Sequence, residues 1–116
     1  MNTYKEYDEL LQGRNKDSKK IAHNTHAMRR GDVIAICLHE TDIITFSPDG
    51  DTIYNTGGWY SVTTKQRLNL FGPVGVYQKR GEWFYANGKP FIDGASVGRW
   101  LIDLGGMAFR PSTVSP

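Results

Sequence analysis

Apolar residues near the start of the chain recur at the spacing of one helical face. They are Tyr4, Tyr7, Leu10 and Leu11. Thr3 and Glu6 match a capping box, in which each side chain satisfies a backbone amide of the other, and Gly13 stops the run. Residues 1–13 are therefore predicted to form a short helix that must dock on the rest of the protein, and the polar residues 14–20 to form a connector.

From residue 21 onwards, short apolar segments between turn residues are typical of strands. The three predicted strand pairs are 21–30 with 33–39, 41–47 with 52–55, and 74–79 with 82–86. Thr63 or Thr64 is predicted to cap a second short helix over 65–71, which Gly72 ends. Ser96 is predicted to cap a third helix, because apolar residues follow it at helical spacing.

These elements predict a single α+β domain over residues 1–116. We expect an antiparallel sheet of five to seven short strands, a short N-terminal helix, and one or two short helices toward the C-terminus. Residues 107–116 are predicted to be a tail. No repeat, linker or low-complexity segment divides the chain.

The composition, with 39 % hydrophobic and 22 % charged residues, is that of an ordinary globular protein with a modest core. No apolar run approaches the roughly 20 residues of a membrane helix. The polar N-terminus does not resemble a signal peptide. The only cysteine, Cys37, lies in the apolar run 33–38, which favours a buried thiol in a reducing compartment. A cytoplasmic location is therefore expected.

The distribution of charge is more informative than the net charge of +2, which is too small to argue for nucleic acid. Cations lie in two blocks, 1–30 and 65–116, and the segment 31–64 between them has acids but no Lys or Arg. Two interpretations stay open. The blocks are solvated surface, or they converge on an anionic ligand.

Catalytic and metal-binding patterns are weak. His23 and His26 are three apart on a predicted strand, so their side chains point to opposite faces, and Cys37 has no second cysteine. Neither a nucleophile elbow nor a glycine-rich phosphate loop occurs. We predict no metal site, no cofactor and no catalytic residue, although a catalytic triad assembled across the fold stays open.

Binding of an anion is better supported. Thr63 and Thr64 offer hydroxyls beside the unpaired amides of a helix start, an arrangement that suits phosphate. Lys65 and Arg67 follow, where the helix dipole disfavours cations by roughly a few tenths of a kcal/mol unless an anion is bound. The alternative is that both cations simply reach water. Likewise, the glycines 57–58 either let the backbone approach a ligand or make a turn.

Aromatic residues are the second ingredient of a possible site. On the predicted strand 82–86, Trp83 and Tyr85 share one face and Phe84 takes the other. One face can pack in the core, which leaves the other to contact a partner or to stack on a base, although any single ring can be purely structural.

Four segments together resemble a widespread family of small phage and prophage proteins. They read IAHNTHAMRR, LHETDI, NTGGWYSVTTKQRLN and VYQKRGEWF. The resemblance covers residues 20–85, and its order and spacing are specific. Two departures, His23 where the family has Asn and Ser61 where Thr is common, keep a hydrogen-bonding side chain.

The chain is also similar to the first class of Thoeris anti-defence proteins. That resemblance implies a phage protein in the bacterial cytoplasm that sequesters a cyclic ADP-ribose isomer made by TIR enzymes and does not cleave it. It also implies a homo-oligomer, which we place on the N-terminal helix, and possible uptake of cyclic oligonucleotide signals. We expect no membrane partner and no nucleic-acid partner.

Ligand-binding roles follow as hypotheses. The expected phosphate ligands are Arg67, Lys65, Thr63, Thr64, Arg99 and Arg110; the expected stacking rings are Phe71 and Trp83; weaker candidates are Ser61, Asn69 and Asn24. The main alternative is a protein-binding inhibitor of a host defence or regulatory protein, of the anti-restriction or anti-CRISPR type. A nucleic-acid binder and a nucleotide-processing enzyme rank below it.

Overall fold

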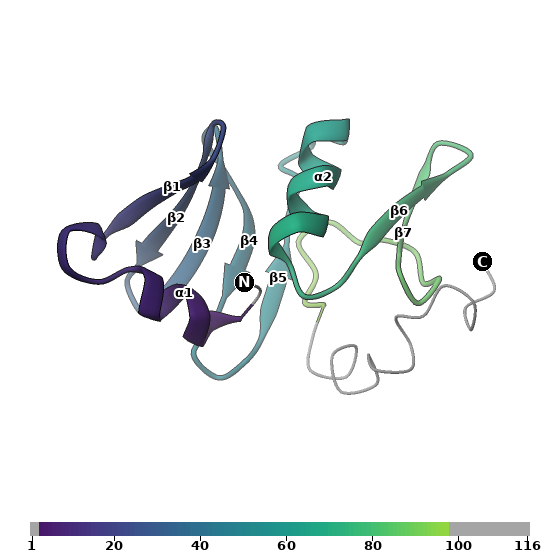
Figure 1. The fold of residues 1–116 in the computed structure, drawn as a ribbon. Coiled ribbons are helices and arrows are strands. Elements are labelled where there is room, and N and C mark those ends of the chain that lie inside the picture. Colours follow the sequence, from purple (N-terminus) through teal and green to yellow (C-terminus); the bar gives the residue numbers. More distant parts are fainter. Residues whose placement is uncertain (1–2, 98–116) are drawn as a thin grey trace.

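The computed structural model describes residues 3–97 as a five-stranded antiparallel sheet, a separate two-stranded hairpin and two α-helices (Figure 1). The large sheet contains β1 (Ser18–Ala22), β2 (Thr25–Arg30), β3 (Val33–Leu38), β4 (Thr41–Phe46) and β5 (Thr52–Tyr54). The other elements are α1 (Tyr4–Leu10), the 3-10 turn η1 (Gly13–Asn15), α2 (Val62–Phe71), and the hairpin of β6 (Val76–Lys79) and β7 (Glu82–Tyr85). The predicted α+β class is confirmed.

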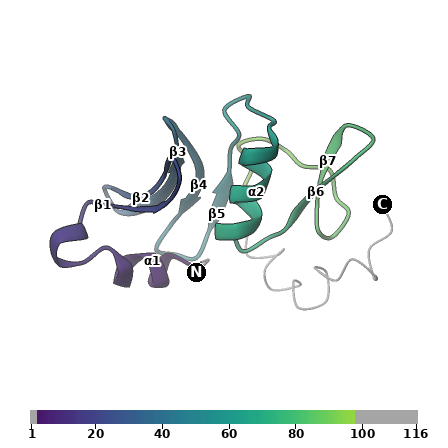
Figure 2. The ribbon, with the colours of Figure 1, turned by 45° about the horizontal axis from the view of Figure 1, so that its top comes forward.

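The large sheet is a meander in which each strand pairs antiparallel with the next, in the order β1-β2-β3-β4-β5. The small hairpin β6–β7 lies on the far side of α2 from this sheet in both views (Figures 1 and 2). Helix α2 therefore separates the two sheets, and its faces are shared between them.

The predicted strand 21–30 is wrong, because the chain turns back at His23 and Asn24. Asn24 has φ 53°, a left-handed conformation that asparagine tolerates better than most residues. Strand β1 consequently begins at Ser18, inside the predicted connector, and β2 lies between two partners. His23 thus lies in a turn, and not on one strand with His26 as predicted.

Helix α2 starts earlier than predicted. Its N-cap is Ser61, whose Oγ accepts a hydrogen bond from the Thr64 amide at 3.1 Å. Ser96, predicted to cap a third helix, instead pairs with Ile53 at the edge of β5. The remainder of that predicted helix and the predicted tail lie outside the described residues.

The core lies between the large sheet and the two helices. Tyr7 and Leu11, each 1 % exposed, pack from the α1 segment, and Leu68 packs from α2. The Tyr7 ring lies 5.1 Å from that of Phe46 on β4. Helix α1 has only seven residues, and this docking holds it in place. The oligomer interface was predicted on this helix, and the buried side chain of the helix, Tyr7, packs within the chain.

One buried hydroxyl joins β5 to the segment that follows α2. The Tyr54 hydroxyl donates to the Val74 carbonyl at 2.7 Å and accepts from the Val74 amide at 2.9 Å. A Cβ at Gly72 would lie 2.0 Å from this oxygen, so the chain passes the Tyr54 ring only because residue 72 is glycine.

Burial raises the pKa of Tyr54 above its ordinary value of 10.0. An unfolded tyrosine loses its proton near pH 10, whereas the folded one keeps it, so above that pH the unfolded state binds fewer protons. The Tyr54 contribution is therefore fully present below about pH 10 and is lost as the pH rises further.

We predict that Tyr54→Phe lowers the free energy of unfolding by about 1–3 kcal/mol, because a buried amide and carbonyl lose their partner. It should also flatten the fall in stability above about pH 10. Urea denaturation at several pH values measures both effects. The control is Tyr77→Phe, which removes a hydroxyl from a half-buried ring and should cost less than about 0.5 kcal/mol. Equal losses for the two variants would contradict the prediction.

Candidate functional site

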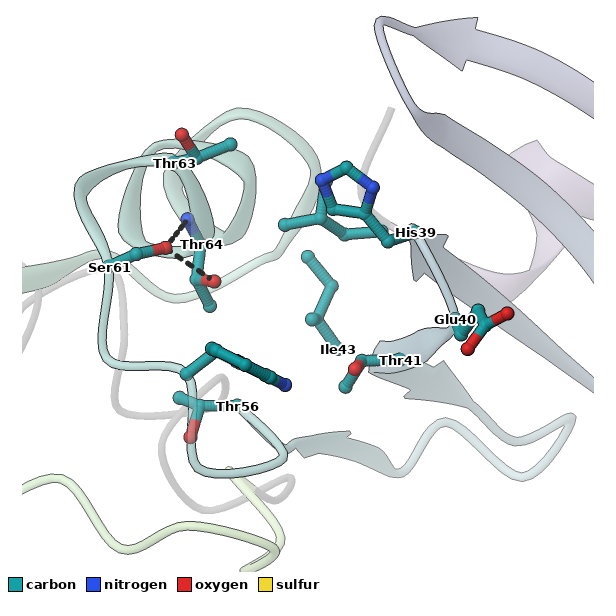
Figure 3. A pocket seen from close by; sticks show the side chains of 10 residues that line it. His39, Glu40, Thr41, Ile43, Thr56, Ser61, Thr63 and Thr64 are labelled. Atoms are coloured by element: carbon teal, nitrogen blue, oxygen red, sulfur yellow. Dashed lines mark hydrogen bonds between the residues drawn. The ribbon is translucent and has the colours of Figure 1, made fainter.

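A cleft of about 710 Å³ opens between the turn that joins β3 to β4 and the start of α2 (Figure 3). Its apolar floor is Leu38 and Ile43, which are 6 % and 1 % exposed. Figure 3 shows Ile43 between His39 on one side and Thr56 on the other. The β3–β4 turn with its flanking strands, the loop that follows β5 and the start of α2 therefore form one concave surface.

The two rims of the cleft carry ring side chains in unusual settings. His39 lies in the β3–β4 turn and has a left-handed backbone with φ 56°. Trp59, in the loop before α2, is 69 % exposed although it borders an apolar floor. A large aromatic ring that is left in water beside a cleft is available to stack on a ligand.

Five hydroxyl residues also line the cleft, and they differ in how they are used. They are Thr41, Thr56, Ser61, Thr63 and Thr64. Ser61 caps α2 and its Oγ lies 3.0 Å from that of Thr64, while Thr56 donates to the Asp93 carboxylate at 2.8 Å. In the described part of the chain, the hydroxyls of Thr41 and Thr63 have no protein partner and are available to a ligand.

Arg67 lies beside the cleft. It is one helical turn after Thr63 and on the same face of α2. Its Nε donates to the Thr25 Oγ1 at 3.0 Å and its Nη2 to the His23 carbonyl at 3.4 Å. The same β1–β2 turn accepts a bond from the His39 amide through the Asn24 carbonyl at 2.8 Å. Arg67 and Asn24, both predicted ligand residues, thus lie at one edge of the cleft.

Lys65 points the other way, because residues two apart on a helix lie on opposite sides. Its Nζ donates to the Gln78 side chain at 3.2 Å and lies 6.0 Å from the centre of the Trp83 ring. Trp83 is 8 % exposed and packs edge-on against Tyr60 and Phe91. Lys65 and Trp83 therefore lie together on the hairpin side of α2, away from the cleft.

Two other predicted ligand residues have structural contacts. The Asn69 side chain donates to the Val76 carbonyl at 2.9 Å and accepts from its amide at 2.6 Å, which joins α2 to β6. Phe71 is half-buried against the core, and its carbonyl accepts from the Tyr7 hydroxyl at 3.3 Å. Arg99 and Arg110 lie outside the described residues.

Of the predicted ligand residues, Ser61, Thr63 and Thr64 thus line the cleft and Arg67 lies at its edge, whereas the lining residues Trp59 and His39 were not predicted. The Gly-Gly-Trp stretch was a usable signal for Trp59, because two glycines in front of a tryptophan favour an exposed, tightly turned segment. Nothing in the sequence marks His39. Among the described residues there is no group of three His, Cys, Asp or Glu side chains that could hold a metal ion.

The fold is that of a small α+β domain, and the model of the family described as Kyanoviridae Gp96 protein matches residues 5–98. The chain belongs to this family, which confirms the expectation of a phage protein family. Neither the curated proteins nor the solved structures contain a match. The helices of residues 3–97 lack the length and apolar character needed to span a membrane.

We predict that Gly57→Ala destabilises the rim of the cleft more than Gly31→Ala does elsewhere. The two glycines have nearly the same backbone, with φ of 65° and 64°. A Cβ at Gly57 would lie 2.9 Å from the Thr41 Cγ2, whereas one at Gly31 would have nothing within 4 Å. Both variants should lose about 1–2 kcal/mol for the left-handed backbone, and Gly57→Ala about 1 kcal/mol or more in addition. Urea denaturation compares the two variants. Equal losses in the free energy of unfolding would show that Thr41 moves aside at no cost.

Proposed function

We propose that this phage protein binds an adenine-containing nucleotide signal, a cyclic ADP-ribose isomer made by TIR enzymes, and sequesters it intact. The observation that carries the proposal is the exposed Trp59 ring beside the cleft at the start of α2. In this proposal the base lies against Trp59, above the apolar floor of Leu38 and Ile43. Base stacking on an aromatic side chain contributes roughly 1–3 kcal/mol per base.

The start of α2 supplies a complementary anion site within the same cleft. The amides of Val62 and Thr63 have no acceptor within the helix, and the helix dipole favours negative charge there. The Thr63 hydroxyl is available, and the Arg67 guanidinium lies one turn further along the same face. A ligand with a planar ring and a phosphate can thus contact both parts of the cleft.

Binding without turnover is part of the proposal. Hydrolysis needs an activated nucleophile, and the hydroxyls of Ser61 and Thr64 are engaged with each other at the helix cap. Burial raises the pKa of the Cys37 thiol, which keeps it protonated, and its Sγ contacts the His39 carbonyl. These contacts favour retention of the ligand over its cleavage.

Isothermal titration with glycocyclic ADP-ribose tests the proposal, and we predict saturable binding with the ligand recovered intact by chromatography. Trp59→Ala should weaken binding by about 1–3 kcal/mol, and Trp59→Phe by much less, because stacking needs only a ring. Tyr60→Ala is the matched control, since Tyr60 packs on Trp83 on the hairpin side. No heat at micromolar protein would end the proposal.

The two helix cations provide a second prediction. Arg67→Ala should weaken binding by about 1.5–3 kcal/mol, the value of a hydrogen bond to a charged group. Lys65→Ala should leave the dissociation constant unchanged, because Lys65 points to the hairpin. Thermal melting of each variant checks that both are folded. Equal losses of affinity would place the anion elsewhere.

A protein-binding inhibitor of a host defence protein is the second candidate. Three neighbouring apolar side chains before and at the start of α2 are exposed, namely Trp59 at 69 %, Tyr60 at 53 % and Val62 at 74 %. Such a surface suits a protein partner. This candidate predicts that nucleotides leave the melting temperature unchanged and that a host protein co-purifies.

A further inference from the structure

The segment 91–97 returns along the outer edge of β5. The Gly94 amide donates to the Tyr54 carbonyl at 2.8 Å, and the Val97 amide to the Thr52 carbonyl at 2.8 Å. Ser96 pairs with Ile53 between them. A part of the chain that is distant in sequence is thereby fixed beside the loop that leads from β5 to α2 (Figure 1).

Within this segment, both carboxylate oxygens of Asp93 accept hydrogen bonds from the loop between β5 and α2. The Thr56 amide donates to Oδ1 at 2.5 Å, and the Thr56 hydroxyl donates to Oδ2 at 2.8 Å. The Thr56 Oγ1 in turn accepts from the Gly58 amide at 3.1 Å. Thr56 is fully buried, so its bonds are shielded from competition with water.

Hydrogen bonds also fix the backbone in the rest of this loop. The Gly57 amide donates to the Asn55 side chain at 2.8 Å, and the Trp59 amide to the Thr56 carbonyl at 3.0 Å. All four amides of residues 56–59 therefore have acceptors, although the loop ends in a largely exposed ring. A rigid backbone beneath an exposed aromatic side chain holds that ring ready for a ligand and reduces the ordering cost of binding.

We infer that Asp93 is a positioning residue that sets the place of the Trp59 ring and thereby the affinity of the cleft. It does not line the cleft, and it acts through Thr56. A carboxylate is suited to this task because it accepts only, and here both of its oxygens face donors. Asp93→Asn has nearly the same shape but turns an NH₂ group toward one of those donors. The part of the inference that concerns affinity rests on the proposed function.

The position of Trp59 can be measured without any ligand. Protein labelled with 5-fluorotryptophan gives a ¹⁹F signal for each tryptophan, and Trp59→Phe identifies the signal of Trp59. In Asp93→Asn we expect this signal to shift or broaden, the other signals to stay, and the amides of Thr56 and Gly58 to exchange about tenfold faster. A folded Asp93→Asn protein with unchanged Trp59 signal and unchanged exchange would overturn the inference.

Asp51→Asn is the matched control, because Asp51 holds the other end of the same segment. Its Oδ1 accepts from the Ser96 hydroxyl and from the Thr52 amide. This variant should lower the melting temperature without moving the Trp59 signal. Should Asp93→Asn fail to fold, Thr56→Val removes only the hydroxyl contacts and should move the same signal to a lesser degree. An unchanged Trp59 signal in that variant would also count against the inference.

With glycocyclic ADP-ribose as the probe, Asp93→Asn should weaken binding at least about tenfold and Asp51→Asn should not. A displaced Trp59 signal with unchanged affinity would refute the claim that Asp93 controls binding. If the unaltered protein does not bind the probe, the proposed function fails, whereas the positioning of Trp59 is still decided by the ¹⁹F signals and the exchange rates.

Discussion

The place of α2 depends on one buried hydroxyl. Tyr54 ends the last strand of the meander, and its oxygen both donates to and accepts from Val74 just beyond the helix. With Leu68 in the core and Asn69 bonded to Val76, these contacts leave the helix only one position against the sheet edge. The cleft exists because α2 starts opposite the β3–β4 turn, so its geometry follows from this attachment.

The two sides of α2 differ in their chemistry, because one faces the meander and the other faces the hairpin. Thr63 and Arg67 face the meander and its turns, where the hydroxyls and the apolar floor lie. Lys65 faces the hairpin, where its ammonium lies over Trp83. Trp59 and Tyr60 are adjacent in the chain but border opposite sides of α2, Trp59 at the cleft and Tyr60 against Trp83.

Much of the fold followed from local pattern. The strand pairs 41–46 with 52–54 and 76–79 with 82–85 were predictable, because apolar segments flanked by turn residues have few other solutions. The hairpin at Asn24 was not, because a polar edge strand has no apolar alternation and asparagine gives only a weak turn signal.

The candidate site was harder to predict for two physical reasons. The helix cap was placed at Thr63 or Thr64 and not at Ser61, which put both cations in the first turn, and both were assigned to one ligand although residues two apart on a helix diverge. The contact between Thr56 and Asp93 joins residues 37 positions apart, and no local rule relates them. Trp59 was not among the predicted ligand residues, because whether a tryptophan is buried depends on packing that the sequence does not state.

The irregular register between β3 and β4 links the floor of the cleft to the core. Ile36 pairs with Ile44 and Cys37 with Asp42, so Ile43 is an extra residue. Ile43 and Ile44 both lie in the core cluster, and Ile43 also lines the cleft. Because Ile43 is 1 % exposed and borders both the core and the cleft, a change in the size of this side chain would alter both at once.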